Sequence, residues 1–267
     1  MTKEDYKDFL DFLCASDRKS FIQDYLNEGG IDAPVIQKEG KSHIYVKFPL
    51  EQYNPLFKIK TVIAHYDVFP GSPGANDNSF AVFVLMLFVR QLIKISGTHN
   101  IRIIFTDGEE SGGDGINEQG AFSLAQTFKK LGITEDEVYV FDCMGRGSIP
   151  IICENPLPEK LPSRLAKGLI ELENKTEKLL KSASGGKWFK IPCSYSDNAG
   201  FIVNGIPAIA VSMLPSDEVN EYLHSGLKPK TWEMLHCKED NAENLTVQSF
   251  ELFFKILILL ANQKTLR

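Results

Sequence analysis

Residues 59–67 read Ile-Lys-Thr-Val-Ile-Ala-His-Tyr-Asp, so a largely apolar run ends directly on His65, Tyr66 and Asp67. Short runs rich in Val and Ile recur at Ile101–Thr106 and Val138–Phe141. Several of these runs are apolar throughout instead of alternating, which is typical of strands that are covered on both faces. The three stretches therefore predict strands of a sheet that lies between two layers of helices.

The segments on either side extend this pattern. Helical spacing is expected over residues 4–28, with a break near Asp17 and an end at Gly29-Gly30. Further strands are expected at His43–Phe48, Ile59–Ala64, Ile149–Cys153 and Pro207–Ser212, and further helices near 79–95, 118–131, 161–181 and 247–262. Strands that alternate with helices predict an α/β fold, a three-layer αβα sandwich with a mostly parallel, mixed central sheet. Residues 212–230 lack periodicity and are expected to form a long surface loop.

Composition narrows the class of protein. The 267 residues are 43% hydrophobic and 24% charged, which is normal for a globular chain, and a single α/β domain over residues 1–267 is expected. The net charge is −6 and no basic run stands out, which disfavours a nucleic-acid partner. Carboxylates that gather around metal cations would give the same acidic balance.

The chain is expected to be cytoplasmic and to have no membrane partner. Its first residues contain no basic segment followed by an apolar run, so no secretory signal is predicted. The most apolar segments, Ala81–Val89 and Ile256–Ala261, are much shorter than the roughly 20 residues that a membrane span needs. The cysteines are odd in number, form no C-x-x-C pair and are expected to be reduced: Cys14, Cys143, Cys153, Cys193 and Cys237.

Candidate metal ligands follow the predicted strands. His65, the pair Glu109-Glu110 and Asp142 each stand at or just beyond the end of a strand, and Asp77 stands just before a predicted helix. The carboxyl ends of strands form the ligand crevice of open α/β sheets, so these side chains could converge. Each one except Asp142 also has an ordinary structural explanation, such as a helix cap or a solvated turn. Imidazole and carboxylate ligands together suit zinc.

The order of these segments resembles the motifs of the co-catalytic zinc aminopeptidases, a family that also includes glutaminyl cyclases and transferrin-receptor-like ectodomains. The resemblance covers about Lys58 to Leu245. The segments that carry it are Ala64-His65-Tyr66-Asp67, Pro73-Gly74-Ala75-Asn76-Asp77-Asn78, Phe105-Thr106-Asp107-Gly108-Glu109-Glu110, Phe141-Asp142, Ser196-Asp197-Asn198 with Gly205-Ile206-Pro207, and Leu235-His236-Cys237-Lys238-Glu239-Asp240.

The resemblance implies a zinc-exopeptidase-like fold and a role for each residue. Asp77 would bridge two Zn²⁺ ions, with one ion as the lesser possibility, and the Asp77–Asn78 peptide bond would be cis. The metal ligands would be His65, Asp77, Glu110, Asp142 and His236. Asp67 would hydrogen-bond His65, and Glu109 would be the general base. Glu109 and Glu110 can act on one site only if the backbone leaves strand geometry, which Gly108 and Gly112-Gly113 would allow.

The sequence departs from the family at several positions. Asn198 stands where a His is usual, Cys237 where a Thr is usual, and Phe80 where small residues are common. His224 is a rival for His236, but it lies in the predicted loop. His43 and His99 have no partner motif and are expected to be structural or exposed. Cys143 and Cys237 adjoin proposed ligands and are expected to be packing residues.

Three functions remain open at this stage. The resemblance favours an aminopeptidase that hydrolyses peptides with a free N-terminus. A glutaminyl cyclase would use the same scaffold to close an N-terminal Gln, but Leu235 stands where cyclases usually place Trp, and neither Trp188 nor Trp232 lies at a cyclase Trp position. A non-catalytic binding protein is the third possibility, although all five ligands and Glu109 are retained. The oligomeric state stays open.

Overall fold

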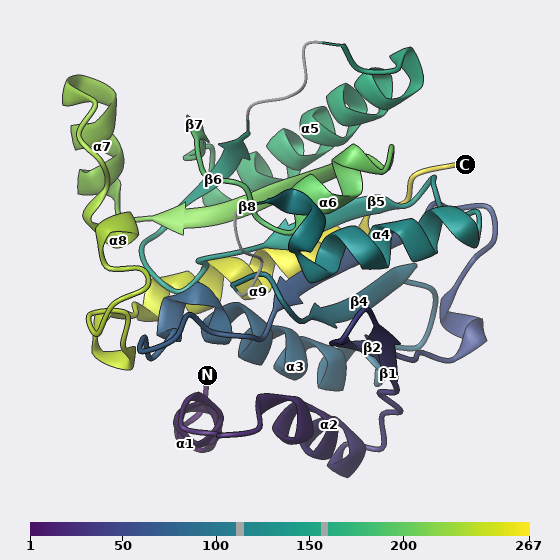
Figure 1. Ribbon diagram of the computed structural model, residues 1–267, viewed down its shortest axis with the longest axis horizontal. Coiled ribbons are helices and arrows are strands. Elements are labelled where there is room, and N and C mark those ends of the chain that lie inside the picture. The colour runs from purple at the N-terminus through teal and green to yellow at the C-terminus, as the bar shows by residue number, and fades with distance from the viewer. Residues whose placement is uncertain (111–114, 156–159) are drawn as a thin grey trace.

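The computed structural model describes residues 1–110, 115–155 and 160–267. Within these residues one sheet has the strand order β1-β2-β4-β3-β5-β8-β6-β7 (Figure 1). The strands are β1 (Val35–Lys38), β2 (Lys41–Val46), β3 (Lys60–His65), β4 (Ile101–Thr106), β5 (Glu137–Phe141), β6 (Ile149–Glu154), β7 (Phe189–Pro192) and β8 (Ala208–Leu214). Strands β4, β3, β5 and β8 are mutually parallel, whereas β1, β2 and the β6–β8 pair add antiparallel contacts. The predicted mixed, mostly parallel sheet is confirmed.

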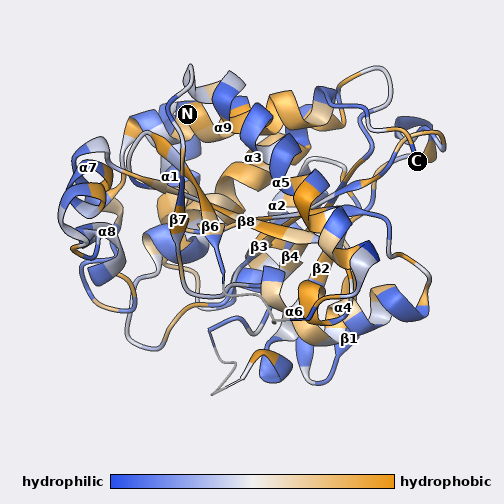
Figure 2. Ribbon diagram, turned by 90° about the horizontal axis from the view of Figure 1, so that it is seen from above, coloured by the Kyte–Doolittle hydropathy of each residue, from blue (hydrophilic) through white to orange (hydrophobic). Residues whose placement is uncertain are grey.

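Helices cover both faces of this sheet. They are α1 (Lys3–Leu13), α2 (Arg18–Glu28), α3 (Phe80–Leu92), α4 (Gly120–Lys130), α5 (Ser163–Ser184), α6 (Asn198–Val203), α7 (Ser216–Ser225), α8 (Lys230–Glu233) and α9 (Val247–Asn262). Short turns are η1 (Leu50–Gln52), the π-helical η2 (Ala75–Ser79), η3 (Ile116–Glu118) and η4 (Ala242–Asn244). Figure 2 shows the strands between α3, α5 and α9 on one side and α4 and α6 on the other.

The strands are buried on both faces, as their apolar runs predict. Along β3, Val62 and Ala64 pack into the cluster that contains α3 and α9, while Ile63 packs into the cluster that contains α4 and α6. Tyr139 and Val140 divide in the same way on β5. Because side chains alternate across a strand, each central strand serves two cores at once.

The predicted break near Asp17 is also confirmed. Asp17 caps α2 by accepting a hydrogen bond from the backbone N–H of Ser20 at 3.0 Å. The expected helices and strands otherwise appear within a few residues of their predicted bounds.

The predicted surface loop over residues 212–230 is wrong. Its first residues belong to β8, and residues Ser216–Ser225 form α7. Only Glu218 and Val219 of this helix are buried, and its apolar residues are limited to Val219, Tyr222 and Leu223, too few to stand out from the polar residues around them. The short elements β1, β7 and α6 were also not expected, because four to six residues carry too little periodicity.

Across the described part of the chain, no helix combines the length and the apolar character that crossing a membrane requires.

Candidate metal centre

The five predicted ligands meet at the end of the sheet where its central parallel strands finish. His65 is the last residue of β3, while Glu110 follows β4 and Asp142 follows β5. Because β4, β3 and β5 are adjacent and parallel, their carboxyl ends lie side by side. Asp77 comes from η2, and His236 comes from the irregular segment between α8 and η4. Because Asp77 and His236 do not follow a strand of this sheet directly, their positions in the sequence do not by themselves predict that they reach the same end of it.

One group of side chains surrounds His65. Its Nε2 atom lies 3.2 Å from Oδ1 of Asp77 and 3.6 Å from Oδ1 of Asp142. The His65 side chain is fully buried, whereas Asp142 is 18% exposed. These three residues offer one nitrogen and two carboxylate oxygens to a common point.

A second group forms on the other side of Asp77. Nε2 of His236 lies 3.2 Å from Oδ2 of Asp77 and 3.2 Å from Oε2 of Glu110. Asp77 therefore offers one oxygen to each group, and the two groups share its carboxylate. The Asp77–Asn78 peptide bond is cis, as the family resemblance implied.

These distances pass a simple test of fit for zinc. Ligand atoms at about 2.0–2.2 Å from a tetrahedral ion lie roughly 3.3–3.6 Å from one another. The measured separations around His65 and His236 run from 3.2 to 3.6 Å. Both ring nitrogens of His65 and Oε1 of Glu110 are buried and have no hydrogen-bond partner among the described residues. Because buried polar atoms are costly when unsatisfied, the two groups suit cations.

The pKa shifts of the residues in the two groups also favour bound cations. Burial, together with the Asp77 charge, raises the pKa of Glu110 to about 8. Burial alone would raise the pKa of Asp77, but contacts with His236 and His65 hold that pKa below its usual range. Burial alone would lower the pKa of His65, but the carboxylates of Asp142, Asp67 and Asp77 raise it. A cation would relieve the repulsion between these crowded carboxylates.

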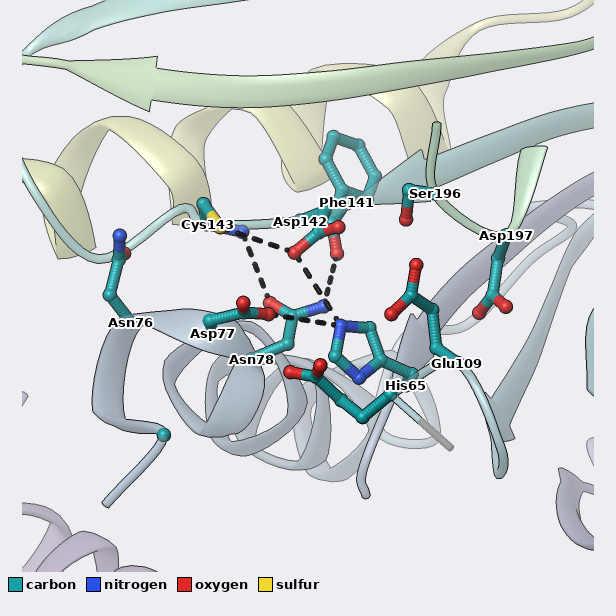
Figure 3. Close-up of polar contacts among 12 residues, drawn as sticks. His65, Asn76, Asp77, Asn78, Glu109, Phe141, Asp142, Cys143, Ser196 and Asp197 are labelled. Carbon is teal, nitrogen blue, oxygen red and sulfur yellow. Dashed lines mark hydrogen bonds and ion pairs between the residues drawn. The ribbon is translucent and has the colours of Figure 1, made fainter. Parts of the chain in front are cut away.

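Asp67 and Glu109 lie beside His65 in the same centre. Oδ1 of Asp67 lies 3.5 Å from Nδ1 of His65, on the opposite side of the ring from Asp77. Glu109 lies between His65 and Asp197 in Figure 3, and the amide of Gln119 donates a hydrogen bond to its Oε1 at 3.2 Å. Burial, with the nearby charges of Asp142 and Asp197, raises the pKa of Glu109 well above its usual range.

The backbone leaves strand geometry after β4, as the sequence analysis required. Strand β4 ends at Thr106, and Gly108 has a left-handed φ of 83°. A Cβ at Gly108 would also meet the side chain of Lys41 at 2.6 Å. The predicted contribution of Gly112 and Gly113 lies outside the described residues.

Two supporting residues were not assigned a role from the sequence. The amide of Asn78 donates to the Phe141 carbonyl at 2.9 Å and accepts from the Cys143 backbone N–H at 3.3 Å, so it holds both neighbours of Asp142 (Figure 3). Asp240 accepts the backbone N–H groups of Asn76 at 2.7 Å and Asp77 at 3.1 Å. Both residues stand in the quoted motifs, but only the folded chain pairs them with their targets.

Asp197 is fully buried beside the centre. Its Oδ2 accepts a hydrogen bond from the hydroxyl of Thr106, and burial raises its pKa to about 7. Its Oδ1 is buried and has no partner in the part of the chain that the structure describes.

An open cavity of about 820 Å³ leads to the centre. Asp77, Glu109, Asp142 and His236 line its inner end. Its walls and rim include the small residues Cys143, Cys153, Ala210 and Ser212 and the larger Tyr195, Trp232 and Leu235. The cavity is large enough for the end of a peptide.

The remaining sequence candidates lie elsewhere. His224 is exposed on α7, where its Nδ1 contacts the Asn220 carbonyl, so it does not rival His236. His43 and His99 are both buried and structural. Cys143 and Cys237 belong to none of the candidate metal groups formed by the described residues. Phe80, which stands where small residues are common in the family, packs in the core against Phe9 and does not line the cavity.

Comparison with known protein families identifies the family of this chain. The profile of peptidase family M28 matches residues 50–261, which span every residue of the two candidate groups. The chain belongs to peptidase family M28. Comparison with curated proteins finds no match.

Solved structures show the same M28 fold at low sequence identity. The Legionella pneumophila LapA aminopeptidase is 18% identical, with a TM-score of 0.69 over 96% of this chain and 70% of its own. A Bacteroides thetaiotaomicron glutaminyl cyclase bound to N-acetylhistamine is 16% identical, with a TM-score of 0.71 over 97% and 95%. A leucine aminopeptidase precursor from the same species is 17% identical, with a TM-score of 0.69 over 97% and 94%. The M28 neighbours thus include both peptidases and cyclases.

Proposed function

We propose that this chain is a zinc-dependent aminopeptidase that releases the N-terminal residue from peptides, and that residues 1–267 form one catalytic domain. The observation that carries the proposal is the division of Asp77 between two groups, each with a histidine and a further carboxylate. Such a pair suits two metal ions bridged by one carboxylate. His65, Asp142 and Asp77 would hold one ion, and Glu110, His236 and Asp77 the other.

The chain's own residues supply the proton chemistry. When bound, two zinc ions polarise a scissile carbonyl and lower the pKa of water. Glu109 belongs to neither of the Asp77 groups, yet it lines the inner end of the cavity. Its carboxylate would take the proton of the attacking water and pass that proton to the leaving amine. Asp67 would keep the proton of His65 on Nδ1, which leaves Nε2 free as a ligand.

The cavity supports hydrolysis. It is open to solvent at the rim, so water has access to the point between Glu109 and the two groups. Leu235 lines this cavity, at the position where cyclases usually place a Trp wall. A cyclase benefits from excluding water and from holding a Gln side chain over its own amine.

One observation favours the cyclase alternative. Trp232 stands three residues before Leu235 and lines the same cavity, packed edge-on against Tyr222 with ring centroids 6.4 Å apart. The indole could provide the aromatic wall that the Leu235 position lacks. Membership of family M28 is compatible with either activity.

Two peptides distinguish these functions. Zinc-loaded protein is incubated with a Leu-initiated and a Gln-initiated peptide, and the products are identified by mass. Release of free Leu, with no activity from Glu109→Gln, is the expected result. Loss of ammonia from the Gln peptide with the Leu peptide intact would make the chain a cyclase. If neither peptide changes, the chain has neither activity on these substrates, and the non-catalytic alternative gains support.

A further inference from the structure

His236 differs from the other members of the two candidate groups in how it is held. The side chains of the other four members are at most 18% exposed, but the side chain of His236 is 48% exposed. It projects from an irregular segment and has a left-handed φ of 61°, which is uncommon for a residue other than glycine. Nothing in the regular secondary structure fixes its ring.

The second ring nitrogen of His236 is not held by the protein in the way that of His65 is. Ligating histidines almost always donate this nitrogen to a carboxylate, a backbone carbonyl or water, and only a protein acceptor, such as the Asp67 that faces Nδ1 of His65, ties the ring to the fold. In the part of the chain that the structure describes, no comparable acceptor contacts Nδ1 of His236. The ring torsion of histidine is intrinsically broad, so some other contact must set the plane of this ring.

Phe69 provides that contact. Its ring lies parallel to the imidazole of His236, with an interplanar angle of 8° and ring centroids 4.5 Å apart. Phe69 is 36% exposed and belongs to none of the three buried core clusters, so its ring lies outside the core and faces His236. A flat face against a flat face fixes the plane of both rings.

The loop that carries Phe69 is itself anchored beside the segment that carries His236. The hydroxyl of Ser72 donates a hydrogen bond to the Cys237 carbonyl at 3.2 Å. Arg18 donates to the Pro73 carbonyl at 3.0 Å and to the Tyr66 carbonyl at 3.4 Å, which holds both ends of the loop. Phe69 is therefore presented to His236 from a fixed backbone.

We infer that Phe69 is a positioning residue, whose ring holds Nε2 of His236 facing Asp77 and Glu110 and so sets the zinc affinity of that half of the centre. The inference rests on the proposed metal centre. Partners that orient a metal ligand typically change metal affinity 10–100-fold when removed, so loss of the stack should weaken zinc at this half about 10-fold. The other half, built on His65 and Asp142, should keep its affinity.

Zinc titration against a chromophoric chelator tests this without relying on activity. Phe69→Leu keeps an apolar side chain but removes the flat face, whereas Phe69→Tyr keeps that face. His236→Ala identifies which of the two zinc affinities belongs to the His236 half. Phe57→Leu is the matched control, because Phe57 is a partly exposed aromatic that contacts Lys264 and Leu266 near the chain's end. Thermal unfolding of each variant checks that the fold is intact.

We expect the wild-type chain to bind two zinc ions. In Phe69→Leu, only the zinc affinity that His236→Ala abolishes should weaken. Phe69→Tyr should restore that affinity, and Phe57→Leu should change neither. If Phe69→Leu binds both zinc ions with the same affinities as the wild-type chain, the role of Phe69 is overturned and the proposed function stays intact. A Phe69→Tyr variant as weak as Phe69→Leu would also overturn it. A wild-type chain that binds no zinc would reject the metal centre and this inference together.

Discussion

Asp67 accepts a hydrogen bond from the backbone N–H of Glu110 at 2.9 Å. The same carboxylate accepts the backbone N–H of Glu109 at 3.3 Å and lies 3.5 Å from Nδ1 of His65. One side chain thus orients a proposed ligand from β3, a proposed ligand after β4 and the proposed base. It links the ends of two adjacent strands at the point where the chemistry is expected.

Asp67→Asn should therefore impair more than one function. The amide keeps one acceptor oxygen but loses the charge that holds the proton of His65 on Nδ1. We expect zinc affinity to fall about 10–100-fold, with a parallel loss of kcat/KM. Chelator competition and peptide hydrolysis measure the two effects. Asp32→Asn is the control, because Asp32 is exposed and its carboxylate pairs with the exposed Lys47. Unchanged zinc affinity in Asp67→Asn would show that His65 is oriented in another way.

Glu109→Gln and Glu110→Gln should differ in zinc content. The first removes the proposed base and no ligand, so kcat should fall by about 10²–10⁴-fold while both zinc ions remain. The second removes a ligand of the His236 half, so one zinc should be lost. Zinc content per chain and kcat on one peptide, measured for both variants, check this pair. Loss of zinc from Glu109→Gln with retention in Glu110→Gln would exchange the two assignments.

His99 predicts a pH dependence of stability far from the metal centre. Burial, and then the charge of Lys60, lower the pKa of His99 to about 4. Its Nδ1 accepts the backbone N–H of Ile101 at 2.9 Å, at the start of β4. A histidine with a lowered folded pKa contributes stability above its unfolded pKa, because the unfolded chain takes up the proton first. That stability is lost as pH falls from about 6.5 towards 4.

His99→Gln isolates this effect. The variant should be less stable than wild type at pH 7.5, and the difference should shrink by about 2 kcal/mol at pH 5, because only wild type loses stability through His99. Urea unfolding of both chains, free of metal, gives the two differences. His224→Gln, which removes an exposed imidazole from α7, should show no such convergence. A difference for His99→Gln that stays constant or widens would contradict the prediction.

The fold could be predicted from the sequence largely because its central strands are apolar on both faces. Runs such as Ile101–Thr106 coincide with a strand to the residue. Prediction was weakest at α7, where the helix is exposed on most of its surface and only Val219, Tyr222 and Leu223 are apolar. The stability of that helix depends on its neighbours and its end residues, which periodicity does not report.

The candidate site could also be predicted only in part. The positions of His65, Glu110 and Asp142 at strand ends predict that these side chains converge, whereas only the family resemblance identified His236 as a ligand. No sequence pattern paired Phe69 with His236 or Asn78 with the backbone around Asp142, because these contacts join residues 63 or more positions apart. Such pairings depend on how the loops return across the end of the sheet.

Anomalous X-ray scattering from a zinc-loaded crystal would locate the metal ions themselves. We expect two zinc peaks, one within bonding distance of His65 and Asp142, the other within bonding distance of Glu110 and His236, and both in contact with Asp77. Well-ordered side chains with no zinc peak among them, or a single peak that leaves one of the two groups without metal under zinc excess, would contradict a two-zinc centre bridged by Asp77.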